Sequence, residues 1–321
     1  MVLAPTVVIG AGVIGLTTAV YLAEAGRDVR VDAELLPDAT TSAAAGATWD
    51  PFLAEPADLV ERWSRESLVV LSALSADKAT GVRMVEGTHE SRVPSGVPVW
   101  ATWADASPCD PAELRQGYVE GWRYRAPVID MPRYLGHLVD RLRKAGGRLR
   151  QHRYGSIEEA LSEAPVVVNC TGTGARDLVD DSSVQAVRGQ LVVVENPGIR
   201  TFFCDDTPGA EELTYIYPQS DVVVLGGTSD WDTWDMRPDV TSALDIVRRC
   251  AAVEPSLVDV PVLAHRVGLR PVRPRVRLET ENRGGAMLIH NYGHGGAGVT
   301  LSWGCAREVE DRLRAVKEPT P

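Results

Sequence analysis

Two glycine-rich stretches at opposite ends of the chain have the residue types and spacing that let backbone amides bind a charged ligand. One is Gly10-Ala-Gly-Val-Ile-Gly15, and the other is His290-Asn-Tyr-Gly-His-Gly-Gly-Ala-Gly298. Each follows a short apolar run typical of a strand and precedes apolar residues at helical spacing. The backbone amides at such a helix start favour negative charge or an electron-rich carbonyl. Together the two stretches predict one large ligand held at both ends.

The first stretch has the G-x-G-x-x-G spacing of a dinucleotide-binding turn. In this motif Gly10 makes the turn, Gly12 lets the backbone approach a pyrophosphate, and Gly15 lets helix and strand pack closely. An acidic residue about 20 positions further on should hold the ribose hydroxyls. Asp32 and Glu34 are both candidates, and we favour Glu34 because Asp32 can still belong to the second strand.

The fingerprint alone fits either a nicotinamide or a flavin nucleotide, and the rest of the chain favours the flavin. Cofactor-like glycine turns recur at residues 169–174 and 291–298. A ligand contacted by the first, middle and last thirds of a chain is expected to be buried and permanently held, as a flavin is. A nicotinamide must exchange, and its enzymes usually carry one compact cofactor domain.

Two arginines in a proline-rich segment are candidates for binding a carboxylate. The segment is Gly268-Leu-Arg-Pro-Val-Arg-Pro-Arg275, in which prolines stiffen Arg270 and Arg273. A guanidinium fork binds a carboxylate through two hydrogen bonds. Taken alone, surface arginines in a proline-rich turn are the commoner interpretation. Tyr215 and Tyr217 lie in a predicted strand, and we expect them to point to opposite faces, so that one can reach a ligand while the other packs.

Composition limits the class of protein. With 321 residues, 44% hydrophobic and 24% charged, the chain is typical of a globular protein with real cores. The net charge of −11 argues against nucleic acid and anionic membranes as partners. No apolar run approaches the roughly 20 residues that span a bilayer, and no secretory signal opens the chain, so we expect a cytoplasmic protein. No histidine or carboxylate spacing fits a metal site, and none is predicted. We expect five buried, reduced thiols, at Cys109, Cys170, Cys204, Cys250 and Cys305.

The predicted elements indicate an α/β protein of two interleaved domains. Strands are expected at 6–9, 28–31, 166–169, 189–194 and 222–226, helices at 59–74, 132–145 and 243–253, and a loop at 33–48. Short β-like runs between 81 and 127 favour antiparallel strands. The domains are a nucleotide-type α/β domain from residues 1–50, 131–190 and 263–321, and a β-rich substrate domain from residues 51–130 and 191–262.

In combination these motifs resemble the D-amino-acid oxidase family of flavoenzymes, in its bacterial form. The resemblance covers essentially the whole chain, and its two most specific parts are Gly268–Pro274 and His290–Gly298. The other segments that carry it are Val7–Gly15, Thr40–Gly46 with Trp49, Val168–Gly172 and Gly189-Gln190. It implies a Rossmann-like domain that binds FAD non-covalently and an antiparallel β-rich substrate domain.

The resemblance also implies oxidative deamination of D-amino acids to 2-oxo acids, ammonia and hydrogen peroxide, by hydride transfer from Cα to flavin N5. It assigns catalytic and substrate-binding roles to Tyr215 and Arg270, which would hold the carboxylate, and to Gly296, whose carbonyl would accept from the amine; Asp50 would also contact substrate. The implied FAD-binding residues are Gly10, Gly12, Val13, Ile14, Gly15, Glu34, Thr40, Thr41, Ser42, Gly46, Thr48, Tyr154, Cys170, Thr171, Gly172, Arg270, Gly295, Gly296, Gly298, Val299 and Thr300.

Departures from the family pattern bear on the substrate. Residues 205–214 lack the lid tyrosine of many relatives, and Asp50 stands where glutamine is frequent. Thr228 and Ser229 occupy the place where aspartate-specific relatives carry an arginine, which favours neutral D-amino acids. The expected partners are a small D-amino acid and molecular oxygen, with a homodimer possible. The alternatives are oxidation of glycine, sarcosine, D-proline or D-aspartate, a non-catalytic FAD sensor, and a nicotinamide dehydrogenase.

Overall fold

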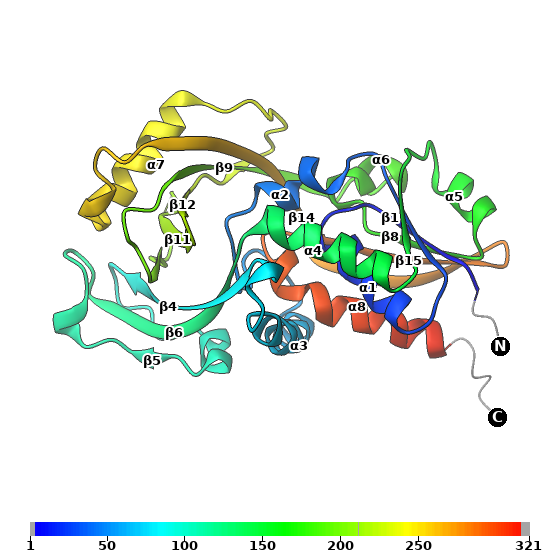
Figure 1. Ribbon diagram of the computed structural model, residues 1–321, viewed down its shortest axis with the longest axis horizontal. Coiled ribbons are helices and arrows are strands. Elements are labelled where there is room, and N and C mark those ends of the chain that lie inside the picture. The colour runs from blue at the N-terminus through cyan, green and yellow to red at the C-terminus, as the bar shows by residue number, and fades with distance from the viewer. Residues whose placement is uncertain (1–3, 211, 316–321) are drawn as a thin grey trace.

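The computed structural model describes residues 4–210 and 212–315. Within them, fifteen strands form one continuous sheet that runs through both halves of the molecule. Figure 1 shows the strands near the N-terminal turn at one end, and those of the β-rich half at the other. The predicted α/β class, with one parallel and one antiparallel part, is confirmed.

The parallel half of the sheet contains the predicted βαβ unit. Its strands, in spatial order, are β15 (Ala286–His294), β8 (Val166–Asn169), β1 (Thr6–Ile9), β2 (Val29–Ala33) and β7 (Arg148–Gln151). Val8 packs on one face, whereas Val7 and Ile9 pack on the other. Apolar residues at successive positions are therefore needed to cover both faces of this sheet.

Helices cover both faces of the parallel half. On the Val8 face lie α1 (Val13–Glu24), α3 (Ala57–Leu74), α4 (Met131–Lys144) and α8 (Gly298–Ala315), and α5 (Ile157–Glu163) lies on the opposite face. α4 begins where the Asp130 side chain accepts from the Arg133 amide, and α5 begins where Ser156 accepts from the Glu159 amide. Such caps satisfy amides that have no partner inside the helix.

The antiparallel half forms the wall of the substrate region. Its strands are β3 (Ala47–Thr48), β6 (Glu120–Ile129), β4 (Val82–Ser91), β10 (Phe202–Asp205), β11 (Tyr215–Gln219), β12 (Val222–Gly226) and β9 (Gln185–Glu195), with the short β5 (Ser107–Pro108) and β13 (Asp230–Trp231) at their margins. One pair in this half, β10 and β4, is parallel. α7 (Val240–Val253) packs on β9, β11 and β12.

One long strand, β14 (Val262–Arg283), joins the two halves. It pairs with β9 over its first part and with β15 over its second. The arginine- and proline-rich segment lies inside this strand, so the interpretation as a surface turn is wrong. Pro274 is tolerated because the ladder to β15 is interrupted between Val272 and Arg277, where no strand amide is required.

Other local expectations also change. The predicted loop at 33–48 contains the short helix α2 (Thr41–Ala44) and β3. Four cysteines are buried as expected, but Cys109 is partly exposed because it lies in the turn between β5 and β6. The proposed domain boundary at 190/191 falls inside β9, and the one at 262/263 falls at the start of β14, the strand that pairs with both halves. In the described residues, no helix is long and apolar enough to cross a bilayer.

Candidate active site

A cavity of about 580 Å³ lies along the line where the two halves meet. Its walls come from the first glycine turn, the end of β8, the segment 40–52, the strands β11 and β14, and the turn before α8. This volume is within the range of sites that bury a small organic ligand. The first, middle and last parts of the chain therefore do meet around one space, as the glycine turns predicted.

The first glycine turn is built for close approach of backbone. Gly10 has φ +111°, and a Cβ there would lie 2.5 Å from the Cys170 carbonyl oxygen. A Cβ on Gly15 would lie 1.9 Å from the Gly10 oxygen, which confirms the predicted packing role. The Val13 amide, at the start of α1, donates to Ser42 Oγ at 2.9 Å. Gly12 lines the cavity, so backbone and a serine hydroxyl together face the ligand space.

The two acidic candidates lie in different environments. Asp32 is fully buried at the end of β2, where it accepts hydrogen bonds from Arg30, Arg150 and the Tyr154 hydroxyl. Burial raises the pKa of Asp32, but these bonds outweigh it and the net pKa is lowered. Glu34 lies on the cavity wall, 3.3 Å from Arg153 Nη1. Because Asp32 is already engaged, Glu34 is the better placed of the two.

The C-terminal glycine stretch is shorter than predicted, because β15 continues to His294. Gly295 has φ +56° and donates to the Pro271 carbonyl at 2.9 Å, while the Gly296 amide donates to the Phe52 carbonyl at 3.1 Å. The amides of the turn are therefore used by the protein. The donors available to a ligand are those of the first turn of α8, from Gly298 onward.

Arg270 and Tyr215 line the same cavity from two different strands. The Arg270 Nη1 atom donates to the Thr228 carbonyl at 3.1 Å. Glycines make room for both side chains: a Cβ on Gly189 would lie 2.5 Å from Arg270 Nη1, and one on Gly226 would lie 1.7 Å from Tyr215 Cζ. Burial raises the pKa of Tyr215, while the charge of Arg270 opposes this. The tyrosine hydroxyl is thus a proton donor at neutral pH.

The expectation that Tyr215 and Tyr217 point to opposite faces is wrong. Their rings are stacked, with centroids 4.6 Å apart and an interplanar angle of 16°. Side chains two residues apart in a strand lie on the same face, because the pleat repeats every two residues. Both rings therefore line the cavity, and Tyr217 extends the wall that Tyr215 begins.

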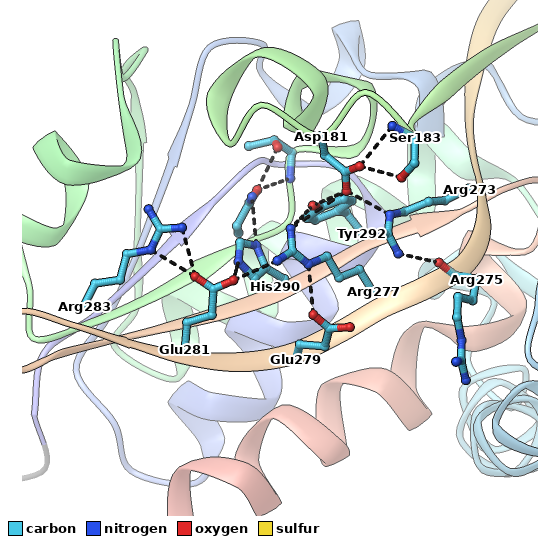
Figure 2. A network of polar contacts seen from close by, with 12 residues as sticks. Asp181, Ser183, Arg273, Arg275, Arg277, Glu279, Glu281, Arg283, His290 and Tyr292 are labelled. Carbon is cyan, nitrogen blue, oxygen red and sulfur yellow. Dashed lines mark hydrogen bonds and ion pairs between the residues drawn. The ribbon is translucent and has the colours of Figure 1, made fainter.

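Arg273, the second candidate, is held outside the cavity by a polar network. Its Nε donates to Asp181 at 2.8 Å, and the Tyr292 hydroxyl donates to the same carboxylate at 2.7 Å. Figure 2 shows this network continuing through Arg277, which donates to Tyr292 at 2.7 Å. Because Tyr292 is on β15 and the arginines are on β14, the network fixes the two strands that carry the cavity wall.

We expect this network to make stability depend on acid pH. Burial raises the pKa of Asp181, but hydrogen bonds from Ser183, Tyr292 and Arg273 lower it more, to about 2. The folded pKa lies below the unfolded value of 3.8, so the contribution is present above pH 4 and is lost as the pH falls toward 2. Asp181→Asn should remove about 2 kcal/mol of unfolding free energy at pH 7. Thermal melts of both proteins from pH 7 to pH 2 check this.

The neighbouring Asp180→Asn is the matched control, because Asp180 is exposed and asparagine tolerates its φ of +58°. That variant should follow the wild-type curve. Identical melting curves for the wild type and Asp181→Asn across this pH range would contradict the assignment.

The cavity gathers nearly all the residues predicted from the sequence to bind a ligand. Those on its wall are Gly10, Gly12, Val13, Ile14, Glu34, Thr40, Thr41, Ser42, Gly46, Thr48, Asp50, Tyr154, Cys170, Thr171, Gly172, Tyr215, Arg270, Gly295, Gly296, Gly298 and Val299. Of the described residues, Gly15 and Thr300 lie behind this wall: the glycine supports the first turn, and the threonine hydroxyl donates to the Asp50 carbonyl at 2.8 Å.

Several wall residues were missed by the sequence prediction: Phe52, His89, Cys204, Asp206, Tyr217 and His294. They lie on elements that are far apart in sequence and adjoin the cavity only because the sheet is continuous. Three of them had a sequence signal: Asp206 lies in the segment considered as a lid, Tyr217 is one of the two strand tyrosines, and His294 lies in the C-terminal glycine stretch.

The wall residues fit a dinucleotide of the size that the glycine turns predict. Amides at the starts of α1 and α8 favour anionic groups. Asn291 Oδ1 and His294 Nε2 are buried and have no hydrogen-bond partner among residues 4–210 and 212–315. Both residues line the cavity, so they offer polar contacts to a bound ligand.

Comparisons with known proteins agree with this geometry. The DAO family model, described as FAD dependent oxidoreductase, matches residues 6–312. The D-amino-acid oxidase of Rubrobacter xylanophilus is 48% identical over 313 residues, covering 96% of this chain and 95% of the relative. The D-amino-acid oxidase of Streptomyces coelicolor is 48% identical over 308 residues, covering 94% of each chain.

Among solved structures, glycine oxidase from Geobacillus kaustophilus has the same fold, with a TM-score of 0.79 at 19% sequence identity, covering 99% of this chain and 95% of that one. The family model and the two sequence relatives span almost the whole chain. This protein therefore belongs to the DAO family of FAD-dependent oxidoreductases.

Proposed function

We propose that this protein catalyses the oxidative deamination of D-amino acids to 2-oxo acids, ammonia and hydrogen peroxide. The observation that carries the proposal is the cavity in which two nucleotide-type glycine turns meet Arg270 and Tyr215. The names of its sequence relatives, D-amino-acid oxidases of two bacteria, support the same reaction. The substrate loses its α-hydrogen with two electrons and one proton from its amine, and water then hydrolyses the imino acid.

FAD would be held by the cavity residues predicted from the sequence. The turn Gly10–Gly15 would receive the pyrophosphate, Glu34 the ribose hydroxyls, and the turn before α8 the ring system. When bound, FAD supplies the hydride acceptor and passes the electrons to molecular oxygen. The free amides in the first turn of α8 would stabilise negative charge on a group bound at this end of the cavity.

The chain's own residues would act by positioning the substrate. Arg270 offers a planar fork to the α-carboxylate, and the protonated Tyr215 hydroxyl adds a second donor. The carbonyl of Gly296 would accept from the amine. The carboxylate, the amine and the side chain of the substrate would each be fixed by a different part of the cavity wall. Only one enantiomer then points its α-hydrogen toward the hydride acceptor. No general base is needed if the amine arrives neutral.

Neutral D-amino acids are the proposed substrates on the sequence argument at Thr228 and Ser229. Thr228 is buried, accepts from the Gln190 amide at 3.0 Å and donates to Asp230 at 3.2 Å. The Thr228 hydroxyl is thus engaged in hydrogen bonds within the protein, and this position carries no positive charge that could bind an acidic substrate side chain. Oxidation of D-aspartate is accordingly a weaker proposal.

The test is the visible spectrum of the purified protein before and after D-methionine is added without oxygen. We expect a yellow protein whose flavin absorbance bleaches with D-methionine and is unchanged with L-methionine. Admitting oxygen should restore the colour and release hydrogen peroxide. A colourless protein would favour a nicotinamide enzyme, and a yellow protein that no D-amino acid bleaches would favour a sensor.

Three further proposals accompany the reaction. The division into an FAD-binding domain and a β-rich substrate domain is supported by the parallel and antiparallel halves of the sheet. A cytoplasmic location is supported by the sequence composition, and a homodimer is proposed without a specific interface. Chromatography with light scattering tests the assembly state.

A further inference from the structure

A chain of polar side chains runs from β14 to the cavity wall. Glu281 lies on β14, His290 on the adjacent β15, and Asn169 on β8, where it is in register with His290. Asn169 and His290 are fully buried, whereas the Glu281 side chain is 30% exposed. Figure 2 shows the Glu281 carboxylate between Arg283 and His290. The chain ends at Thr171, which lines the cavity.

Glu281 fixes which ring nitrogen of His290 carries the proton. The Glu281 carboxylate accepts from Arg277 at 2.8 Å and from Arg283 at 2.9 Å. Burial raises the pKa of Glu281, but the two arginines outweigh it and the net pKa is lowered, so the ionised group only accepts. Burial also lowers the pKa of His290 to about 4, so its ring is neutral at pH 7 and has one N–H. Because the His290 Nε2 atom lies 3.2 Å from the Glu281 Oε1 atom, that N–H is on Nε2.

His290 in turn orients the side-chain amide of Asn169. With its proton on Nε2, the His290 ring can only accept at Nδ1. This atom lies 3.5 Å from Asn169 Nδ2, a long hydrogen bond, and neither atom has another partner among residues 4–210 and 212–315. The Asn169 Oδ1 atom therefore faces Thr171, whose amide donates to it at 3.2 Å and whose hydroxyl donates to it at 2.7 Å.

This arrangement leaves the Thr171 hydroxyl as an acceptor toward the cavity. A threonine hydroxyl has one proton and two lone pairs, and here the proton is used in the bond to Asn169. The oxygen can accept from a hydroxyl or an amino group, but it has no proton to donate to a phosphate oxygen. FAD contains both kinds of group, because its pyrophosphate only accepts, whereas its ribityl and ribose hydroxyls and its adenine amino group donate.

We propose that His290 and Asn169 are positioning residues for FAD, which hold the Thr171 hydroxyl as an acceptor for a donor group of the cofactor. Neither residue is among those that line the cavity, so both act through Thr171. Glu281, ionised between two arginines, fixes the histidine tautomer at the outer end. The turn after β8 thus complements the first glycine turn: the amides of that turn favour the pyrophosphate, and Thr171 favours a hydroxyl or an amino group.

The binding test is a double-mutant cycle between Thr171 and His290, with the FAD Kd of the apoprotein as the readout. Thr171→Val removes the hydroxyl and should raise the Kd about 3- to 10-fold, the range of one net hydrogen bond. Thr171→Ser keeps the hydroxyl and should stay within about twofold of the wild type. His290→Leu should raise the Kd by a similar factor to Thr171→Val, because Asn169 Nδ2 loses its acceptor and the amide is free to turn away. In the Thr171→Val background the same change should alter the Kd by less than about twofold.

A conservative variant and a control separate positioning from simple support of the strand. His290→Gln should bind FAD like the wild type, since its amide oxygen can accept from Asn169 and its amide nitrogen can donate to Glu281. His137→Leu makes the same change as His290→Leu at a histidine on α4 that does not line the cavity, and it should leave the Kd unchanged. An unchanged Kd in His290→Leu, or an equal effect of that change with and without the Thr171 hydroxyl, would overturn the inference.

A second measurement reads the tautomer itself and keeps the inference testable even if His290→Leu does not fold. Nitrogen NMR of the FAD-loaded protein with isotope-labelled histidine distinguishes the two neutral forms of the ring, and the His290 signal is the one lost in His290→Gln. We expect the Nε2–H form at pH 7. The Nδ1–H form would overturn the inference, because the Asn169 amide would then have to present its oxygen to His290. A protein that binds FAD as described but oxidises no D-amino acid would sink the proposed function alone.

Discussion

Replacing Arg270 by leucine is expected to reduce kcat/KM for D-methionine by roughly 10³-fold while the protein retains FAD. The guanidinium lies on the cavity wall, with one nitrogen donating to the Thr228 carbonyl. Removing one partner of a buried charged pair costs about 2–5 kcal/mol, and each 1.4 kcal/mol is about tenfold. Steady-state peroxide assays and the flavin spectrum of the same preparation measure both parts of the expectation.

Arg275→Leu provides the matched control, because Arg275 is exposed on the same strand. That variant should keep wild-type kcat/KM and the same flavin content. If Arg270→Leu oxidised D-methionine at the wild-type rate, the carboxylate would have to be bound elsewhere. If instead the variant lost FAD, Arg270 would be supporting the cofactor, and the effect on turnover would say nothing of the carboxylate.

Replacing Gly15 by alanine is expected to lower both stability and FAD affinity. A Cβ at this position would lie 1.9 Å from the Gly10 carbonyl oxygen, which is a backbone atom in the tightest part of the turn. Helix and turn would have to separate, and overpacking of this kind costs about 3 kcal/mol. We expect the unfolding free energy of the apoprotein to fall by that amount. FAD affinity should fall more than about tenfold, because the amides that face the cofactor move with the turn.

The control is Gly136→Ala in α4, where a Cβ would meet nothing within 4 Å. Both glycines are in helices, so the substitutions differ chiefly in the space available. Gly136→Ala should be neutral or stabilise the protein by up to about 1 kcal/mol, since alanine is the better helix former. Denaturant unfolding and an FAD titration of each apoprotein measure the contrast. Wild-type stability and FAD affinity in Gly15→Ala would contradict the prediction, because they would show that the turn accommodates a Cβ at this position.

Local sequence patterns determined the parts of this protein that depend on neighbouring residues. The spacing of Gly10, Gly12 and Gly15 predicts the first turn, because each glycine meets a steric demand set within a few residues. Apolar spacing predicts α1, α3 and α4. In contrast, the end of β15 was misplaced, since Asn291, Tyr292 and His294 are in register with residues of β14, a pairing that local sequence does not reveal.

Tertiary structure decided which charged groups are available to a ligand. Arg270 and Arg273 occur in the same sequence context, but Arg273 is hydrogen-bonded to Asp181, whereas Arg270 lies on the cavity wall. Likewise, Arg30, Arg150 and Tyr154 satisfy Asp32, whereas Asp50 has no such neighbours among the described residues. A motif fixes the type and spacing of side chains along the chain. The free energy of each charge, however, is set by partners that only folding brings together.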